Sequence, residues 1–193
     1  KTKMAMLIRF GALFLLASIA IAEPINGNFV RASDEAPAKD NGEVCDAEAN
    51  ADLDAQVTRG VWYWSLGQES YTKAAHCFQK AAEAGYPRGQ FWLGTLYEGG
   101  EGVPQDYERA RHWYHQAAEQ GSPYAQYGLG RLYFDVDGAP RDLVKAHKWI
   151  NIAATSGHIL AIRTRERLTK MMGADQVAEA HRLAREWIDQ NSD

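Results

Sequence analysis

Residues 81–86 read AAEAGY, residues 117–122 read AAEQGS and residues 153–158 read AATSGH, so one short pattern returns every 36 residues. The surrounding chain aligns without a gap as three segments, 51–86, 87–122 and 123–158. Self-similarity at a fixed period of this length is typical of proteins built from stacked structural repeats. The sequence therefore predicts a solenoid.

Within each repeat, the apolar residues follow the spacing of two amphipathic helices, an A helix and a B helix. In the second repeat, apolar side chains recur at i, i+3, i+4 and i+7 from Pro87 to Glu98 and again from Tyr107 to Gln120. Neither helix can bury its apolar stripe alone, so neighbouring helix pairs must stack around one continuous core. The sequence therefore predicts an all-α protein.

The predicted B helices carry capping residues at equivalent positions of the three repeats. Ser70, Asp106 and Asp142 stand where a side chain would accept hydrogen bonds from the free amides of the first turn. Each B helix ends at a glycine, which adopts the left-handed C-cap conformation without steric penalty: Gly85, Gly121 and Gly157. Both signals place the helix boundaries independently of the apolar pattern.

The residues between the caps predict how the helices pack. The alanine pairs of the repeated pattern let each B helix approach its neighbour closely. Trp113 and Trp149, at equivalent positions of the second and third repeats, are expected to fill the wider gaps between repeats.

The second repeat carries a longer pattern that resembles the Sel1-like repeat. The matching residues are Leu93, Gly94, Tyr97, Gly100, Gly102, Val103, Asp106, Ala110, Trp113, Tyr114, Ala117, Ala118, Glu119 and Gly121. The related tetratricopeptide repeat has a shorter period, and the additional residues here lie in the loop Gly99–Gln105. The resemblance implies a right-handed α/α solenoid of stacked antiparallel helix pairs, with three full repeats and a C-terminal partial repeat.

The first repeat departs from this pattern. At the positions of Gly94, Gly100 and Trp113 it has Thr58, Trp64 and Cys77. We expect its helix pair to be distorted or to act as an N-terminal cap.

The resemblance continues after the third repeat as a degenerate cap over residues 159–190. Ile159–Lys170 is predicted to form a fourth A helix, and Asp175–Gln190 a closing B helix. Ala180, Ala184 and Trp187 would share one face of that closing helix. The resemblance therefore implies a repeat domain over residues 51–190.

The N-terminal residues 1–22 are predicted to be a secretory signal peptide. Arg9 precedes the apolar run Phe10–Ile21, and Ala20 and Ala22 suit signal peptidase, with cleavage before Glu23. The run is shorter than the roughly 20 residues that span a bilayer as a helix, although an uncleaved membrane anchor is the alternative. No cysteine stands at the cleavage point, so a lipoprotein is not expected. The mature chain is expected in the periplasm or outside the cell.

Residues 23–50 are predicted to be a flexible tether, because they are rich in Asp, Glu, Asn, Gly, Ala and Pro. Cleavage would remove three of the 21 basic residues and none of the 25 acidic ones, so the formal net charge would fall from -4 to -7. An acidic chain of this kind argues against nucleic acid as a partner.

Cys45 and Cys77 are the two cysteines of the chain, and an exported protein with two cysteines favours a disulfide. Cys77 is predicted to lie on the buried face of a B helix, whereas Cys45 precedes the first A helix. A bond would require the tether to fold back over the first helix pair. Two independent thiols are the alternative.

The sequence contains two candidate chemical sites, each with a simpler explanation. Ser70 and Lys73 form a Ser-x-x-Lys string, but the partner motifs of penicillin-interacting serine enzymes are missing from the mature chain, and Ser70 stands at a capping position. His112 and His115 could hold a metal ion from one helix face, but two ligands make a weak site, and His76 at the equivalent position of the first repeat indicates a solvated face. We therefore predict no catalytic residues, no metal and no cofactor.

The remaining candidate site is a surface on the A helices, which the fold places on the concave side of the solenoid. Its predicted partner-binding residues are Arg59, Arg88, Trp92, Thr95, Tyr124 and Arg131. Arginine and tryptophan are favoured at binding hot spots, and a basic, aromatic surface suits an acidic peptide. The alternative is that Trp92 and Tyr124 pack between repeats. Residues 62–64 form a second cluster that looks exposed, but the favoured alternative is that Trp64 fills space left by the irregular loop Leu66–Glu69.

The resemblance implies a non-enzymatic module that binds a protein or peptide partner, acting as an adaptor or regulator in the bacterial cell envelope. A second hypothesis is an enzyme that binds or hydrolyses beta-lactams or peptidoglycan fragments, as cysteine-rich Sel1-like relatives do. A third is direct binding of a wall glycan by the aromatic residues. The family also leaves open an endoplasmic reticulum location in a eukaryote.

Overall fold

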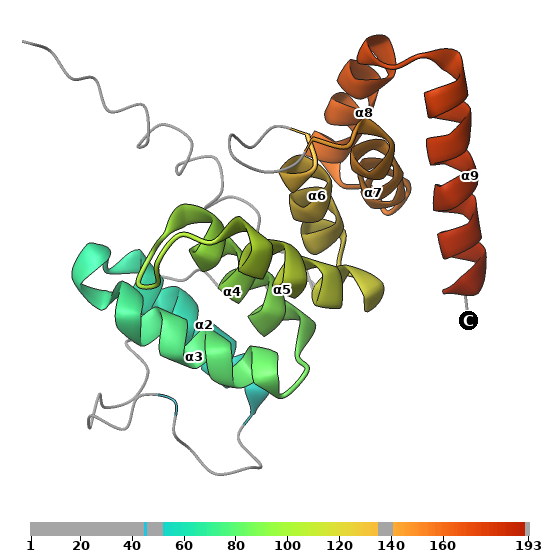
Figure 1. Cartoon of the computed structure of the whole chain (residues 1–193). Coiled ribbons are helices and arrows are strands. Elements are labelled where there is room, and N and C mark those ends of the chain that lie inside the picture. The colour runs from blue at the N-terminus through green and yellow to red at the C-terminus, as the bar shows by residue number, and fades with distance from the viewer. Residues whose placement is uncertain (1–44, 46–51, 135–140, 192–193) are drawn as a thin grey trace, which may run out of the picture. The chain divides into compact units, whose positions relative to one another are not determined.

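The computed structural model describes residues 45, 52–134 and 141–191, and every regular element among them is helical. Figure 1 shows the helices, which follow one another in the order α2 (Leu53–Ser65), α3 (Tyr71–Glu83), α4 (Pro87–Gly99), α5 (Tyr107–Glu119), α6 (Pro123–Leu132), α7 (Leu143–Thr155), α8 (Ile159–Met171) and α9 (Ala174–Gln190). A short 3-10 helix, η1 (Gln68–Ser70), precedes α3. The predicted signal peptide 1–22 and the predicted tether 23–50, apart from Cys45, lie outside the described residues.

The three repeats form the predicted helix pairs α2/α3, α4/α5 and α6/α7. Each helix from α2 to α7 packs against the next one along the chain, and α4 also contacts the A helices on either side of it, α2 and α6. These contacts confirm the α/α solenoid. The predicted bounds of the second repeat, Pro87 to Glu98 and Tyr107 to Gln120, agree with α4 and α5 to within one residue.

Two of the three predicted N-caps form. The Asp106 carboxylate accepts hydrogen bonds from the backbone amides of Glu108 and Arg109, each at 3.0 Å, and Asp142 accepts one from the amide of Lys145 at 3.0 Å. The prediction for Ser70 was wrong, because its side chain makes no capping hydrogen bond. Ser70 belongs to η1 and has helical backbone angles, whereas a capping residue needs an extended backbone to turn its oxygen toward the amides.

The repeated AAxxGx pattern is explained by an identical helix end in all three repeats. At the end of α5, the Gly121 amide donates to the Ala118 carbonyl at 3.0 Å and the Ser122 amide donates to the Ala117 carbonyl at 3.1 Å. Gly121 has φ +84°, and the same two bonds recur at Gly85 and Gly157. This is the Schellman arrangement, which satisfies two carbonyls at the end of the helix.

Glycine in the A helices allows the two helices of a repeat to approach closely. A Cβ atom at Gly94 would lie 2.7 Å from the Tyr114 ring, and one at Gly130 would lie 2.6 Å from Ile150. The alanines of the B helices are buried beside these contacts, as predicted. Trp149 is buried and Trp113 is half-buried in clusters that span neighbouring repeats.

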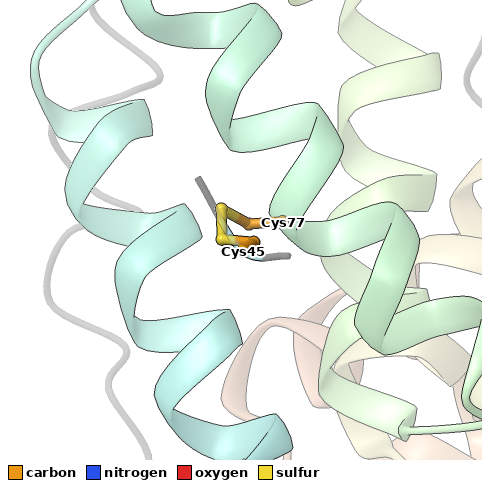
Figure 2. The surroundings of a disulfide bond; sticks show 2 residues. All are labelled: Cys45 and Cys77. Atoms are coloured by element: carbon orange, nitrogen blue, oxygen red, sulfur yellow. A yellow bond between two sulfur atoms is a disulfide. The ribbon is translucent and has the colours of Figure 1, made fainter. Parts of the chain in front are cut away.

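The first repeat is closed by a disulfide between Cys45 and Cys77 (Figure 2). Their Cα atoms are 5.2 Å apart, and both residues are buried in the core cluster that contains Val57 and Phe78. Cys77 stands where the other repeats have Trp113 and Trp149. Cys45 belongs to the segment predicted to be a flexible tether, and at this residue the chain is covalently anchored.

The fourth helix pair packs differently from the others. Helices α8 and α9 both lie against α7 and make few contacts with each other. Ala180 and Ala184 of α9 are buried, and the Trp187 indole nitrogen donates to Glu119 of α5 at 3.2 Å. The closing helix therefore folds back over α7 instead of pairing with α8.

The sequence of α8 differs from that of α4 and α6 at two positions that face a B helix. Glu166 occupies the position of Gly94 and Gly130, where the second and third repeats have no side chain. Arg165 occupies the position of a buried leucine, and its guanidinium donates to Asn151 of α7 at 3.0 Å. In α4 and α6, the leucine and the glycine at these two positions are buried.

Candidate functional site

The six predicted partner-binding residues lie on the three A helices of the repeats. Arg59 is on α2, Arg88, Trp92 and Thr95 are on α4, and Tyr124 and Arg131 are on α6. All six are half-buried. Their contacts divide them into separate groups instead of one continuous patch.

Arg88 forms an ion pair with Asp54 of α2. Its Nη1 donates to Asp54 Oδ1, and the Tyr86 hydroxyl donates to the same oxygen at 2.9 Å. The Arg88 side chain is still 42% exposed. Part of its guanidinium therefore remains accessible to a partner, although one carboxylate is already bound.

Thr95 and Arg131 belong to a polar network that connects three helices. The Tyr114 hydroxyl donates to Glu98 Oε2 at 2.7 Å and lies 3.1 Å from Thr95 Oγ1. Arg131 Nη2 donates to the other Glu98 oxygen at 2.9 Å. Burial and the Glu98 charge raise the pKa of Tyr114 well above its usual value, so the hydroxyl keeps its proton.

Sequence reasoning missed Glu98 and Tyr114 as members of this network. A weak signal was present, because Glu98 follows Thr95 by three residues and so shares its helix face. The pairing of Glu98 with Arg131 has no local signal, since the two residues belong to different repeats. Thr95 and Arg131 therefore bond to groups within the fold, where they help to hold the helices of the solenoid in place.

Trp92 and Tyr124 make aromatic contacts across repeat boundaries. The Trp92 ring stacks on Phe78 of α3 with a centroid distance of 5.4 Å, and it also contacts Trp64 at 5.5 Å. The Tyr124 ring lies 6.0 Å from the Phe91 ring of α4, in the second repeat, and it also meets the edge of the His158 ring of its own repeat at 5.1 Å. These contacts agree with the alternative given in the sequence analysis, in which Trp92 and Tyr124 pack between repeats.

The second aromatic cluster, residues 62–64, is part of the first-repeat core, which agrees with the favoured alternative that these residues pack within the fold. Tyr63 is 2% exposed, and Trp62 and Trp64 are half-buried against the same cluster. The Trp64 indole nitrogen donates to Glu101 at 2.6 Å, in the irregular A-to-B loop of the next repeat.

The residues of the two candidate chemical sites, the Ser-x-x-Lys string and the histidine pair, contact neighbouring side chains of the fold. Lys73 Nζ lies 5.2 Å from the Tyr63 ring centroid, and Ser70 stays at the start of α3. His112 contacts the Trp113 ring, and His115 lies 3.7 Å from Glu119. Among residues 45, 52–134 and 141–191, no three His, Cys, Asp or Glu side chains come close enough to hold a metal ion.

In the same part of the chain, no helix has the length and apolar character needed to cross a membrane.

A surface that the sequence did not predict lies between α8 and α9. It is an open depression of about 610 Å³, called here the terminal depression, and it is lined by Thr169, Met172, Ala174, Val177, Ala178, His181 and Arg185. The sequence shows one difference at this end of the chain, since Glu166 stands where the second and third repeats have glycine.

His147 of α7 lies beneath this surface. Its side chain is fully buried, and its Nε2 lies 3.1 Å from the Thr169 hydroxyl, while Nδ1 has no partner among the described residues. Burial, together with the nearby charges of His181 and Arg165, lowers the pKa of His147 to about 4. The ring is therefore neutral at physiological pH.

Comparisons with known proteins agree with the repeat pattern. A family model described as the Sel1 repeat matches residues 60–86, 87–122 and 123–158. The chain is similar to c5321, a protective antigen of uropathogenic Escherichia coli strains that displays an SLR fold, with 35% identity, a TM-score of 0.69 and 73% of this chain covered. It is also similar to a Sel1 repeat protein from Oxalobacter formigenes, with 34% identity and a TM-score of 0.52 over 60% of this chain and 89% of that one.

The chain spans 31% of the length of c5321, so the likeness covers about a third of that protein. A comparison with curated proteins finds no match.

Proposed function

The chain belongs to the Sel1 repeat family, and we propose that it is an exported, non-enzymatic interaction module that serves as an adaptor or regulator in the bacterial cell envelope. The observation that carries the proposal is the stack of three Sel1 repeats, an architecture whose members generally mediate protein interactions. Stacked repeats present an extended surface without any catalytic group common to the repeats.

The Cys45–Cys77 disulfide supports the exported location. Disulfides persist in oxidising compartments such as the bacterial periplasm and are rare in the cytosol. The predicted signal peptide 1–22 leads to the same compartment. The mature protein is then expected in the periplasm or outside the cell.

The partner surface proposed here is the A-helix layer, where an acidic peptide would meet basic side chains. Arg88 and Arg59 are its best candidates, because Thr95 and Arg131 are engaged in the Glu98 network and Trp92 stacks on Phe78. Removing Trp92 would disturb the core, so it does not make a clean test of binding.

The experiment is a pull-down from the bacterial envelope with the mature chain from Glu23 onward. The test variant is Arg59→Ala/Arg88→Ala, and the matched control is Arg109→Ala, which removes a 64% exposed arginine from the B helix α5. We expect one protein to be captured by the native chain and by the control but lost with the test variant. Capture of the same proteins by all three would exclude the A-helix layer, and capture of none would contradict the interaction module.

A separate measurement tests the location. The full chain expressed in a bacterium should appear in the periplasmic fraction with a mass that corresponds to cleavage before Glu23. Its two cysteines should resist alkylation until a reductant is added. Recovery of an uncleaved, alkylatable chain from the cytosol would contradict export.

A further inference from the structure

We propose that the α8–α9 end of the solenoid docks a single helix of a partner protein, and that this helix presents a row of apolar side chains flanked by carboxylates. The proposal rests on the interaction module proposed above and assigns it a second surface, distinct from the A-helix layer.

Within the solenoid, each repeat adds a helix that packs on the B helix of the repeat before it. Helix α4 packs on α3, α6 packs on α5, and α8 packs on α7, so each B helix is covered by the next A helix. At the end of the described chain, α8 and α9 both rest on α7 and leave the terminal depression between them. No described residue fills it.

The α9 wall of the depression is one continuous helix face. Its residues are Ala174, Val177, Ala178, His181 and Arg185, at spacings i, i+3, i+4, i+7 and i+11. The two alanines leave room for another helix to approach closely, as the alanines of the B helices do within the repeats. The face carries no carboxylate.

The α8 wall extends the depression along a helix face that carries two exposed isoleucines. Ile159, Ile162, Glu166 and Thr169 fall at i, i+3, i+7 and i+10, so they share one face, and Thr169 lines the depression. Ile159 is 70% exposed and Ile162 is 38% exposed. Ten residues of helix span about 15 Å, which matches almost three turns of a docked helix.

The charges around this surface favour a carboxylate-bearing partner. Arg185 and His181 lie in the lining, and Arg163 and Lys170 are exposed on α8. Helix α8 has four basic residues and one acidic residue, in a chain whose formal net charge is -4. On α9, Glu179 and Glu186 are already bound by Arg182.

The same charges disfavour a second copy of this chain. A two-fold contact through α8 would bring Arg163 and Lys170 of both copies together, and like charges that face one another are destabilising. An amphipathic helix of opposite charge, laid into the depression with its apolar residues at i, i+3, i+4 and i+7, satisfies both walls.

The test is site-specific photo-crosslinking with the full chain in the bacterium that produces it. A benzoylphenylalanine replaces Ile162 in one variant and Leu66 in a matched variant, since Leu66 is 55% exposed on the first repeat. Mass spectrometry then identifies the crosslinked segment. We expect position 162 alone to capture a helical segment rich in Asp and Glu.

A peptide with the sequence of the crosslinked segment allows its affinity for the mature chain to be measured. Its affinity for the mature chain should fall at least tenfold with Arg185→Glu and stay within twofold of native with Arg109→Glu, after circular dichroism shows both variants to be folded. Equal affinity for all three chains would overturn the proposal.

Three other outcomes would also overturn it: no crosslink at position 162, a crosslink to a second copy of this chain, or a captured segment that is basic or extended. If the A-helix layer still captures a partner in the pull-down, the proposed function stands and only this docking site fails.

Discussion

Glu98 of α4 and Tyr114 of α5 are joined by a hydrogen bond of 2.7 Å, with Tyr114 only 2% exposed. Because Arg131 of α6 binds the other Glu98 oxygen, this carboxylate ties the second repeat to the third. A partly buried carboxylate that accepts from two groups fixes the relative position of three helices, which apolar packing alone does less specifically.

Tyr114→Phe is expected to lower the free energy of unfolding by about 1–3 kcal/mol, because Glu98 and Thr95 would lose a buried partner. Urea unfolding followed by circular dichroism measures this change. The matched control is Tyr107→Phe, whose hydroxyl accepts a hydrogen bond from Gln105 at an exposed site. A Tyr114 variant as stable as the Tyr107 control would show that the network does not hold the repeats together.

Cys45→Ser is expected to cost about 3–4 kcal/mol of stability, since the bond closes a loop with a sequence separation of 32 residues. The native chain should lose the same amount when a reductant is added, whereas the variant should not respond to it. An unchanged unfolding midpoint in the variant would mean that residues around the disulfide hold the first repeat without it.

Gly94→Ala is expected to destabilise the chain by about 1–3 kcal/mol, because the added methyl would overlap the Tyr114 ring and push α4 from α5. Gly99→Ala serves as the control, since its added Cβ would meet only the flexible Glu101 side chain at 3.3 Å. Thermal unfolding of both variants measures the difference in their stability. Equal stability would contradict the close approach of helices A and B as the reason for glycine.

Stability should fall as the pH drops from 6.5 to 4, because the unfolded chain protonates His147 below 6.5 while the folded chain resists until about 4. The loss from this residue is at most about 3 kcal/mol. His147→Gln should flatten the slope of stability against pH in this range. Some slope should remain, since burial also lowers the pKa of His158. Parallel pH profiles for the native chain and the variant would exclude His147 as the cause.

The sequence by itself determined the repeat period, the helix bounds and the family. Each of these depends on local chemistry, because a glycine with positive φ, an aspartate before the first turn and an apolar stripe act within about one helical turn. That is why Gly121 and Asp106 behave as predicted.

The tertiary structure decided which side chains meet across repeats. The Glu98–Arg131 pair, the stacking of Trp92 on Phe78 and the Cys45–Cys77 bond join residues far apart in the chain, so no local pattern encodes them. The opening between α8 and α9 follows the same rule. Glu166 was visible in the sequence as a departure from Gly94 and Gly130, but only the packed helices show that α8 and α9 both lie on α7 and make few contacts with each other.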